Sequence, residues 1–341
     1  MPDTHNWTDP YGVPVRIFAR GWNGPMRDFL FALGVAWTLW KQRRHYQLVY
    51  FLMQGLHLAT GLPIARLLRK PLVMKVSGST VITLMRQSIL GRLELRWLDR
   101  WAYRIMILNS GMQDEALAGG LHKDRLFWMP NPVDTEEFAP VEASGRCALR
   151  RQLGMAPDGP IILFVGRLAP EKALPSLLGA FRRVLRSFPQ ARLVLVGDGP
   201  DRPSLARLAG SPDMAGAVVF TGRQTAGEVV VWLKAADLFT LVSSNEGFSC
   251  ALLEAMSAGL PSVVSSIPAN TQLIEAGVHG LHAPVGDEES LAAAFCELLS
   301  NDSLRTQMGH AARRLVLERY SLEKVIDRYE ALFGDSLRHQ A

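Results

Sequence analysis

The chain has 341 residues, of which 48% are hydrophobic and 20% charged, and its formal net charge is +5. This length fits two average domains, and the apolar content supplies two cores, which excludes a disordered chain. Its three cysteines (Cys147, Cys250 and Cys296) are scattered and not in CxxC spacing, which argues against a disulfide framework or a zinc knuckle. They favour a reducing, cytoplasmic compartment.

The first residues are polar and carry Asp3 and Asp9, so no secretory signal peptide is expected. Residues 29–40 are apolar but too few to span a bilayer, which predicts a buried or interfacial helix. A basic cluster, Lys41 to Arg44, follows directly.

The positive charge lies in the first part of the chain. Residues 1–141 hold 17 Lys and Arg against 11 Asp and Glu, whereas the remainder holds 20 against 21. Such a basic half fits peripheral contact with an anionic membrane or an anionic acceptor, and a solvated basic surface accounts for it equally well. No recognised nucleic-acid module is present, so no nucleic-acid partner is expected.

The first half alternates between strand-like and helical patterns, and its expected boundary lies after Pro140. Strands are predicted at 15–20, 48–53, 71–77, 104–109 and 126–130, and helices at 26–44, 57–69, 80–102 and 111–119.

The second half shows the same alternation more clearly, because its apolar runs are continuous and β-branched. Such runs joined by helices predict a parallel, doubly wound α/β sheet. Strands are predicted at 162–166, 192–197, 217–222, 237–242, 261–266 and 280–285, with helices at 174–187, 201–209, 226–235, 250–258, 270–276 and 288–300, and a last amphipathic helix at 321–333.

The segment 236–266 carries two carboxylates, Glu246 and Glu254, eight residues apart. One precedes a predicted helix and the other lies inside it, so both are expected at the carboxyl edge of the sheet, where open α/β folds bind ligands. The backbone N–H groups from Gly247 to Cys250 are placed to face an anion.

A second motif, FVGRLAPEKA, follows the strand that ends at Gly166. It places Arg167 and Lys172 at a helix start, where two cations suit a leaving diphosphate. The alternative is a surface salt-bridge cluster with Glu171.

Two further motifs end the next strands. In VGDGP, Gly197 and Gly199 permit a tight bend and a close backbone approach. FTGR places Arg223 and then Gln224 after the third strand, where an ordinary loop explains them.

Together these motifs resemble the donor-sugar site of the retaining GT-B glycosyltransferases of family 4, which carry a Glu-x7-Glu motif. The resemblance implies two Rossmann-like doubly wound domains facing a cleft: 1–140 on the acceptor side, 141–318 binding the nucleotide sugar, and 319–341 as a helix packing back on the first domain. The matching residues of the Glu-x7-Glu segment are Glu246, Gly247, Phe248, Ser249, Leu253, Glu254, Ala255, Met256, Gly259 and Pro261.

The resemblance also implies roles. Arg167 and Lys172 stabilise the leaving diphosphate, Glu246 and the Gly247–Ser249 amides hold the donor sugar, and Glu254 binds the ribose hydroxyls. FTGR is similar to the family segment next to the nucleobase, which makes Arg223 and Gln224 candidates for base or ribose contacts. No metal and no cofactor are implied beyond the nucleotide diphosphate sugar, for which UDP is favoured.

Three departures from the family pattern concern single residues. Ala173 replaces a Gly, at little cost if its φ is negative; Pro132 replaces another Gly; and Ser77 stands where the family often has a His. In addition, the strand at 15–20 resembles the family's second strand, so the first domain is expected to lack its opening strand and loop.

The function expected from this resemblance is a metal-independent hexosyltransferase that acts on a saccharide or lipid-linked acceptor in polysaccharide or glycolipid synthesis. Two alternatives stay open: an inactive GT-B partner protein that binds a sugar nucleotide, and a GT-B sugar-nucleotide epimerase.

Overall fold

The computed structural model describes residues 5–8, 14–17 and 24–339. The chain forms two compact units, one reaching Met129 and resumed at Arg328, the other running from Pro130 to Asp327. Residues 130–140, which the sequence assigns to the first domain, therefore belong to the second unit. The reason is a pair of backbone hydrogen bonds, from Val133 N–H to the Tyr320 carbonyl (2.9 Å) and from Leu322 N–H to the Val133 carbonyl (3.0 Å).

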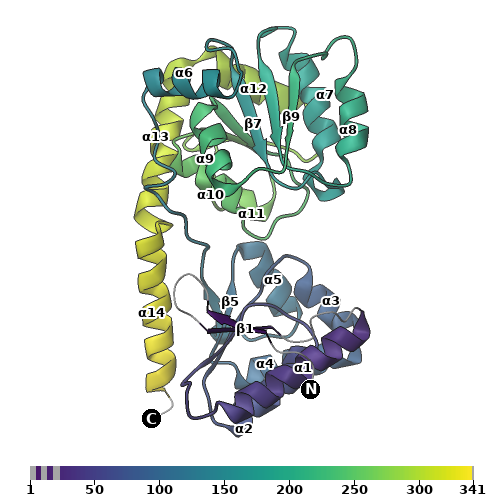
Figure 1. Ribbon diagram of the computed structural model, residues 1–341, viewed down its shortest axis with the longest axis vertical. Coiled ribbons are helices and arrows are strands. Elements are labelled where there is room, and N and C mark those ends of the chain that lie inside the picture. The colour runs from purple at the N-terminus through teal and green to yellow at the C-terminus, as the bar shows by residue number, and fades with distance from the viewer. Residues whose placement is uncertain (1–4, 9–13, 18–23, 340–341) are drawn as a thin grey trace. The chain divides into compact units, whose positions relative to one another are not determined.

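The first unit is built on a four-stranded parallel sheet in sequence order. The strands are β3 (Val49–Phe51), β4 (Leu72–Lys75), β5 (Arg104–Ile107) and β6 (Leu126–Trp128). Its helices are α1 (Pro25–Lys41), α2 (His57–Leu67), α3 (Val81–Gln87), α4 (Ile89–Trp101) and α5 (Ser110–Ala118), with a short 3-10 turn, η1 (Lys123–Arg125). Within this unit, α1 packs on α2 and α2 packs on α4 (Figure 1).

Two sequence predictions for this unit are corrected. The strand predicted at 15–20 is β2 (Pro14–Ile17), which pairs antiparallel with β1 (His5–Thr8) in a separate two-stranded sheet; residues 18–20 lie outside the described residues. The helix predicted at 80–102 is broken at Ser88, whose hydroxyl caps α4 by accepting from Gly91 N–H (2.9 Å). A Cβ at Gly91 would lie 2.1 Å from the Met85 carbonyl oxygen, so the chain turns tightly here.

The second unit contains a six-stranded parallel sheet in the order β12-β11-β10-β7-β8-β9. All six predicted strands are present: β7 (Ile161–Val165), β8 (Arg192–Val196), β9 (Val218–Gly222), β10 (Leu238–Leu241), β11 (Ser262–Ser265) and β12 (Gly280–Ala283). The order runs outward in both directions from β7 and β10, so these two neighbours form the topological switch point, where loops diverge and ligands bind in such sheets.

Helices cover both faces of this sheet (Figure 1). On one face α7 packs against α8 and α12, and on the other α9 packs against α6 and α10 against α13. Fully buried aromatic side chains, among them Phe164 and Phe239 on the two central strands, fill the core between the layers. The helices of this unit are α6 (Ala143–Gln152), α7 (Leu174–Val184), α8 (Arg202–Ala209), α9 (Ala226–Ala235), α10 (Cys250–Ser257), α11 (Pro268–Thr271), α12 (Glu288–Ser300) and α13 (Asp302–Arg319). The last helix, α14 (Leu322–Arg338), begins in this unit, and its residues from Arg328 onward belong to the first unit.

Within the described part of the chain, no helix combines the length and the apolar character needed to cross a membrane.

Candidate functional site

The loops that follow β7 and β10 meet at the switch point. Lys172, at the end of a 3-10 turn (η2, Pro170–Lys172), forms an ion pair with Glu246, which lies between β10 and α10. Both side chains are largely buried, 15% and 12% exposed. The hydroxyl of Ser243 donates a second hydrogen bond to the same carboxylate oxygen (2.6 Å). The sheet order thus brings together two charged residues that lie 74 positions apart.

The partner of Lys172 decides between two interpretations of its motif. Lys172 pairs with Glu246 and not with Glu171, whose side chain is exposed. Glu171 contributes its backbone instead, because its carbonyl accepts from Ser244 N–H (2.8 Å) and binds the two loops together. The surface salt-bridge cluster with Glu171 is therefore not what the structure shows.

A hollow of about 620 Å³ opens at the carboxyl ends of β7, β8 and β9. It brings together six of the predicted residues and adds Asp198, which sequence reasoning missed. Asp198 lies between the two glycines of VGDGP, and its carboxylate accepts from Gly199 N–H (2.8 Å). The predicted residues that line the hollow are Gly166, Arg167, Gly197, Gly199, Arg223 and Gln224.

The two glycines of VGDGP are required by the neighbouring loop. A Cβ at Gly197, whose φ is +134°, would lie 2.0 Å from the Gly166 carbonyl oxygen. A Cβ at Gly199 would lie 2.2 Å from the carbonyl oxygen of Leu168. Since backbone atoms cannot give way as a side chain can, these glycines let the loops after β7 and β8 pack against each other, which shapes the floor of the hollow.

Ala173 corrects an expectation. Its φ is +46°, in the left-handed region, and not negative as a mild departure from the family glycine requires. A non-glycine residue is strained there because its Cβ crowds the following carbonyl oxygen. Ala173 is the N-cap position of α7, so the strain lies immediately after Lys172.

The start of α10 is packed into the core. Phe248 is 8% exposed and its ring lies 5.9 Å from that of Tyr320, while Leu253 is fully buried. The hydroxyl of Ser249 caps the helix by accepting from Leu252 N–H (3.2 Å). The side chains of Phe248 and Leu253 therefore support the loop that carries Glu246 and Gly247, and the burial of Leu253 argues against its predicted contact with a substrate.

Glu254 lies half-buried on α10. Burial raises the pKa of its carboxyl group, and the nearby Glu137 carboxylate raises this pKa further by repulsion. Glu137 is not among the site residues predicted from the sequence, so its influence on Glu254 was not foreseen.

One family model matches the part of the chain that carries the predicted site residues. Residues 146–315 match the family described as glycosyl transferases group 1, and every predicted site residue lies inside that range. The chain belongs to the group 1 glycosyl transferases.

Among curated relatives, this group 1 glycosyl transferase is 34% identical over 244 residues to a GDP-mannose-dependent alpha-mannosyltransferase of Mycobacterium tuberculosis, covering 70% of this chain and 59% of the relative. It is 30% identical over 190 residues to N-acetyl-alpha-D-glucosaminyl L-malate synthase of Bacillus anthracis, covering 56% and 49%. The chain thus spans about half the length of these curated relatives.

Solved structures show the same fold. The crystal structure of Anabaena HepE in complex with UDP superposes with a TM-score of 0.79 at 20% identity, covering 92% of this chain and 84% of that one. Sucrose-phosphate synthase from Thermosynechococcus elongatus superposes equally well, with a TM-score of 0.79 at 18% identity, covering 98% and 86%. The α/β architecture with two parallel-sheet domains expected for GT-B enzymes is confirmed.

Proposed function

We propose that this protein is a retaining, metal-independent glycosyltransferase that moves a hexosyl group from a nucleotide diphosphate sugar, with UDP as the favoured nucleotide, to an acceptor hydroxyl. The observation that carries this proposal is the largely buried Lys172–Glu246 pair at the switch point, in the same unit as the hollow that Arg167 lines. Relatives named for sugar transfer and a neighbour solved with UDP support it.

The charges of the site suit the departure of a diphosphate. When the bond between the anomeric carbon and the phosphate oxygen breaks, its electron pair stays on that oxygen, and nearby fixed cations stabilise it. Arg167, exposed in the hollow, and Lys172 supply those cations. The acceptor hydroxyl attacks on the same face and gives its proton to the leaving phosphate oxygen, so the anomeric configuration is retained.

The ion pair adds a step to substrate binding. An entering diphosphate competes with Glu246 for Lys172, because both are anions and the ammonium group is already paired. Once Lys172 turns to the phosphate, the Glu246 carboxylate is left to accept from the hydroxyls of the donor sugar, with Ser243 still holding it in place. Glu254 binds the ribose hydroxyls in this proposal, and Arg223 lies on the nucleoside side of the hollow.

The acceptor is proposed to be a saccharide or a lipid-linked precursor reached from the cytoplasmic face of a membrane. Support comes from α1, where Phe29, Trp37 and Trp40 are each about half exposed. Lys41 lies 4.5 Å from the Trp37 ring centroid, so a basic group accompanies the aromatic one. Aromatic and basic side chains on one helix are typical of peripheral contact with an anionic bilayer.

Two measurements test the proposal. A thermal-shift screen against UDP-, GDP-, ADP- and dTDP-sugars identifies the donor, since a ligand that binds the folded state raises its stability. Nucleotide release from that donor is then followed in wild type, Arg167→Ala and Lys172→Ala, with Arg207→Ala on exposed α8 as the control.

We expect the two site variants to lose roughly a hundredfold or more in rate, as is usual when one stabilising group is removed, and the control to lose none. Equal, slow release by all four proteins would contradict catalysis. It would favour a partner protein that binds a sugar nucleotide without turning it over.

A further inference from the structure

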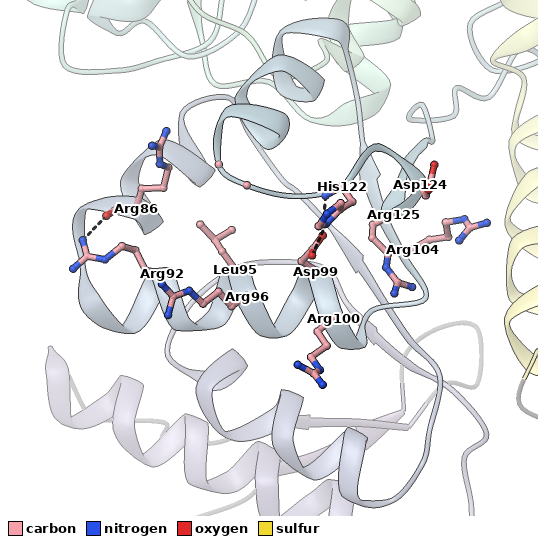
Figure 2. Close-up of a pocket in the computed structure, with 12 residues that line it drawn as sticks. Arg86, Arg92, Leu95, Arg96, Asp99, Arg100, Arg104, His122, Asp124 and Arg125 are labelled. Atoms are coloured by element: carbon pink, nitrogen blue, oxygen red, sulfur yellow. Dashed lines mark hydrogen bonds and ion pairs between the residues drawn. The ribbon is translucent and has the colours of Figure 1, made fainter.

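A second hollow, of about 950 Å³, lies in the first unit and is lined by arginines (Figure 2). Arg92, Arg96 and Arg100 recur every fourth residue along α4, so they share one side of that helix. The other three come from α3, from the start of β5 and from the turn before β6. The six arginines are Arg86, Arg92, Arg96, Arg100, Arg104 and Arg125.

The positive charge of this arginine hollow is not neutralised. Two acids, Asp99 and Asp124, also line it, which leaves a formal surplus of four positive charges with His122 neutral. Asp99 is engaged elsewhere, since it accepts from the backbone N–H of His122 and contacts its ring, both at 2.7 Å. Across residues 24–339, no carboxylate forms an ion pair with any of the six arginines.

The hollow lies away from the edge of the sheet that binds substrates in such folds. Arg104 begins β5 and Arg125 immediately precedes β6, so the hollow opens where these parallel strands start. Ligands of open α/β sheets bind at the opposite edge, where the strands end. Figure 2 shows the Asp99–His122 pair between Arg92 and Arg96 on one side and Arg104 and Arg125 on the other. The hollow is therefore a site separate from the donor site and from the acceptor-side sheet edge.

Exposed apolar side chains occur where α3 joins α4, close in sequence to two arginines of the hollow. Ile89 is 81% exposed, and Leu84, Leu90 and Leu93 on the same two helices are also exposed. Two of the arginines, Arg86 and Arg92, lie within three residues of these side chains along the chain. Exposed apolar side chains beside unneutralised arginines fit the boundary between headgroups and acyl chains of a bilayer better than they fit a soluble anion.

We infer that the arginine hollow binds the phosphate groups of anionic lipids while the α3–α4 corner enters the bilayer surface. Arginine suits this ligand because its planar fork donates two hydrogen bonds to one phosphate. The inference deepens the proposed membrane contact, which rests on α1, by assigning headgroup recognition to different residues.

The test is flotation of the full chain with vesicles of phosphatidylcholine, alone or containing about 30 mol% phosphatidylglycerol, which gives a negative surface. Arg96→Gln/Arg100→Gln is compared with Arg151→Gln/Arg207→Gln, a matched pair of exposed arginines in the second unit that removes the same charge. Leu90→Ser/Leu93→Ser tests the exposed apolar side chains of the α3–α4 corner. Thermal shifts with inorganic tripolyphosphate provide a soluble phosphate probe, and unchanged melting temperatures without ligand show that the variants fold.

We expect wild type and the matched control to bind the anionic vesicles. Arg96→Gln/Arg100→Gln should bind about 30-fold more weakly, because each basic residue near an anionic surface contributes roughly fivefold. The leucine variant should also bind more weakly. Equal vesicle binding by both arginine pairs would overturn the inference. A different result would overturn the lipid as the source of the phosphate. In it, wild type does not bind vesicles but is stabilised by tripolyphosphate, and Arg96→Gln/Arg100→Gln loses this stabilisation. The ligand would then be a soluble phosphate.

The inference and the proposed function fail separately. Trp37→Ala/Trp40→Ala removes the aromatic groups of α1 and leaves the hollow intact. If this variant lost vesicle binding while Arg96→Gln/Arg100→Gln kept it, the proposed membrane contact through α1 would stand. The proposed binding of lipid phosphates in the hollow would be overturned. Catalysis does not enter the readout, so a protein without turnover still gives a clear answer.

Discussion

The two units differ in whether charged side chains have partners of opposite charge. In the second unit, Arg150 is 6% exposed and pairs with Asp237 at 2.6 Å, and Lys172 pairs with Glu246. In the first unit, the arginines of the hollow have no acidic partner among the residues described, and Arg96 is exposed on α4. Buried, paired charges belong to the architecture, whereas clustered, unpaired ones repel each other and persist where an anionic ligand neutralises them.

Matched arginine substitutions provide the largest test of this comparison. Arg150→Ala removes the Asp237 ion pair and the hydrogen bonds that Arg150 donates to the carbonyls of Ala235 (2.9 Å) and Pro157 (2.9 Å). It leaves a buried carboxylate weakly paired, so we expect the free energy of unfolding to fall by about 3–5 kcal/mol. Arg96→Ala should change it by less than about 0.5 kcal/mol, or raise it by relieving repulsion. Urea unfolding measures both, and similar losses in the two variants would remove the distinction.

Glu94 is the exception in the first unit, because it is a buried acid on α4, 5% exposed. Its Oε1 has no hydrogen-bond partner among the described residues, and burial raises the pKa of the carboxyl to about 7. The folded protein thus holds this proton more tightly than the unfolded chain, whose glutamate pKa is about 4.5. The associated stability is fully present below pH 4.5 and is lost as the pH rises towards 7.

Glu94→Gln should therefore stabilise the protein at pH 8 by up to about 3 kcal/mol, since the amide carries no charge to bury. Unfolding free energies measured from pH 5 to 8 should fall more steeply in wild type than in the variant. If the unfolding free energies of wild type and Glu94→Gln fell in parallel with pH, titration of Glu94 would not be the cause of the fall. Glu297→Gln on α12 is the control for loss of one carboxylate.

Local pattern was enough to predict the second unit. Its strands are continuous apolar runs, so all six were located, and the motifs that end β7, β8 and β9 were found directly after them. The pairing of Lys172 with Glu246 was beyond that reasoning, since it depends on β10 lying beside β7 and not beside β9. The left-handed φ of Ala173 could not be predicted either, because an alanine, unlike a glycine, does not indicate a positive φ.

The first unit shows where local pattern fails. The run at 15–20 looks like any strand, yet β2 pairs with β1 outside the parallel sheet. The four-residue spacing from Arg92 to Arg100 is readable along α4, but Arg104 and Arg125 join it only because β5 and β6 are adjacent. Sites assembled from the starts of strands have no consecutive motif, so the arginine hollow emerged only in three dimensions.

A smaller effect concerns the acid of the proposed ribose site. Because burial and then Glu137 raise the pKa of Glu254, its carboxylate form is lost at a higher pH than for an ordinary glutamate. A carboxylate that accepts from ribose hydroxyls binds best when ionised, so nucleotide affinity should fall as the pH falls through this raised pKa. Calorimetric titration with UDP from pH 5 to 8 measures this pH dependence of the affinity. Glu137→Gln should move the transition to lower pH, and Glu254→Gln should abolish it; an unchanged midpoint in Glu137→Gln would contradict the repulsion between the two acids.

The smallest expected effect is at Ala173, in the well-packed unit. Its φ of +46° strains an alanine but not a glycine, so Ala173→Gly relieves the strain next to Lys172. Glycine also increases the entropy of the unfolded chain, which offsets part of the gain, and the net stabilisation should be about 0.5–1 kcal/mol. Thermal unfolding measures it, with Ala226→Gly at the start of α9, an ordinary helical position, expected to lose stability. If both variants lose stability, the backbone at Ala173 is not strained, and the paired loops hold that conformation at no cost.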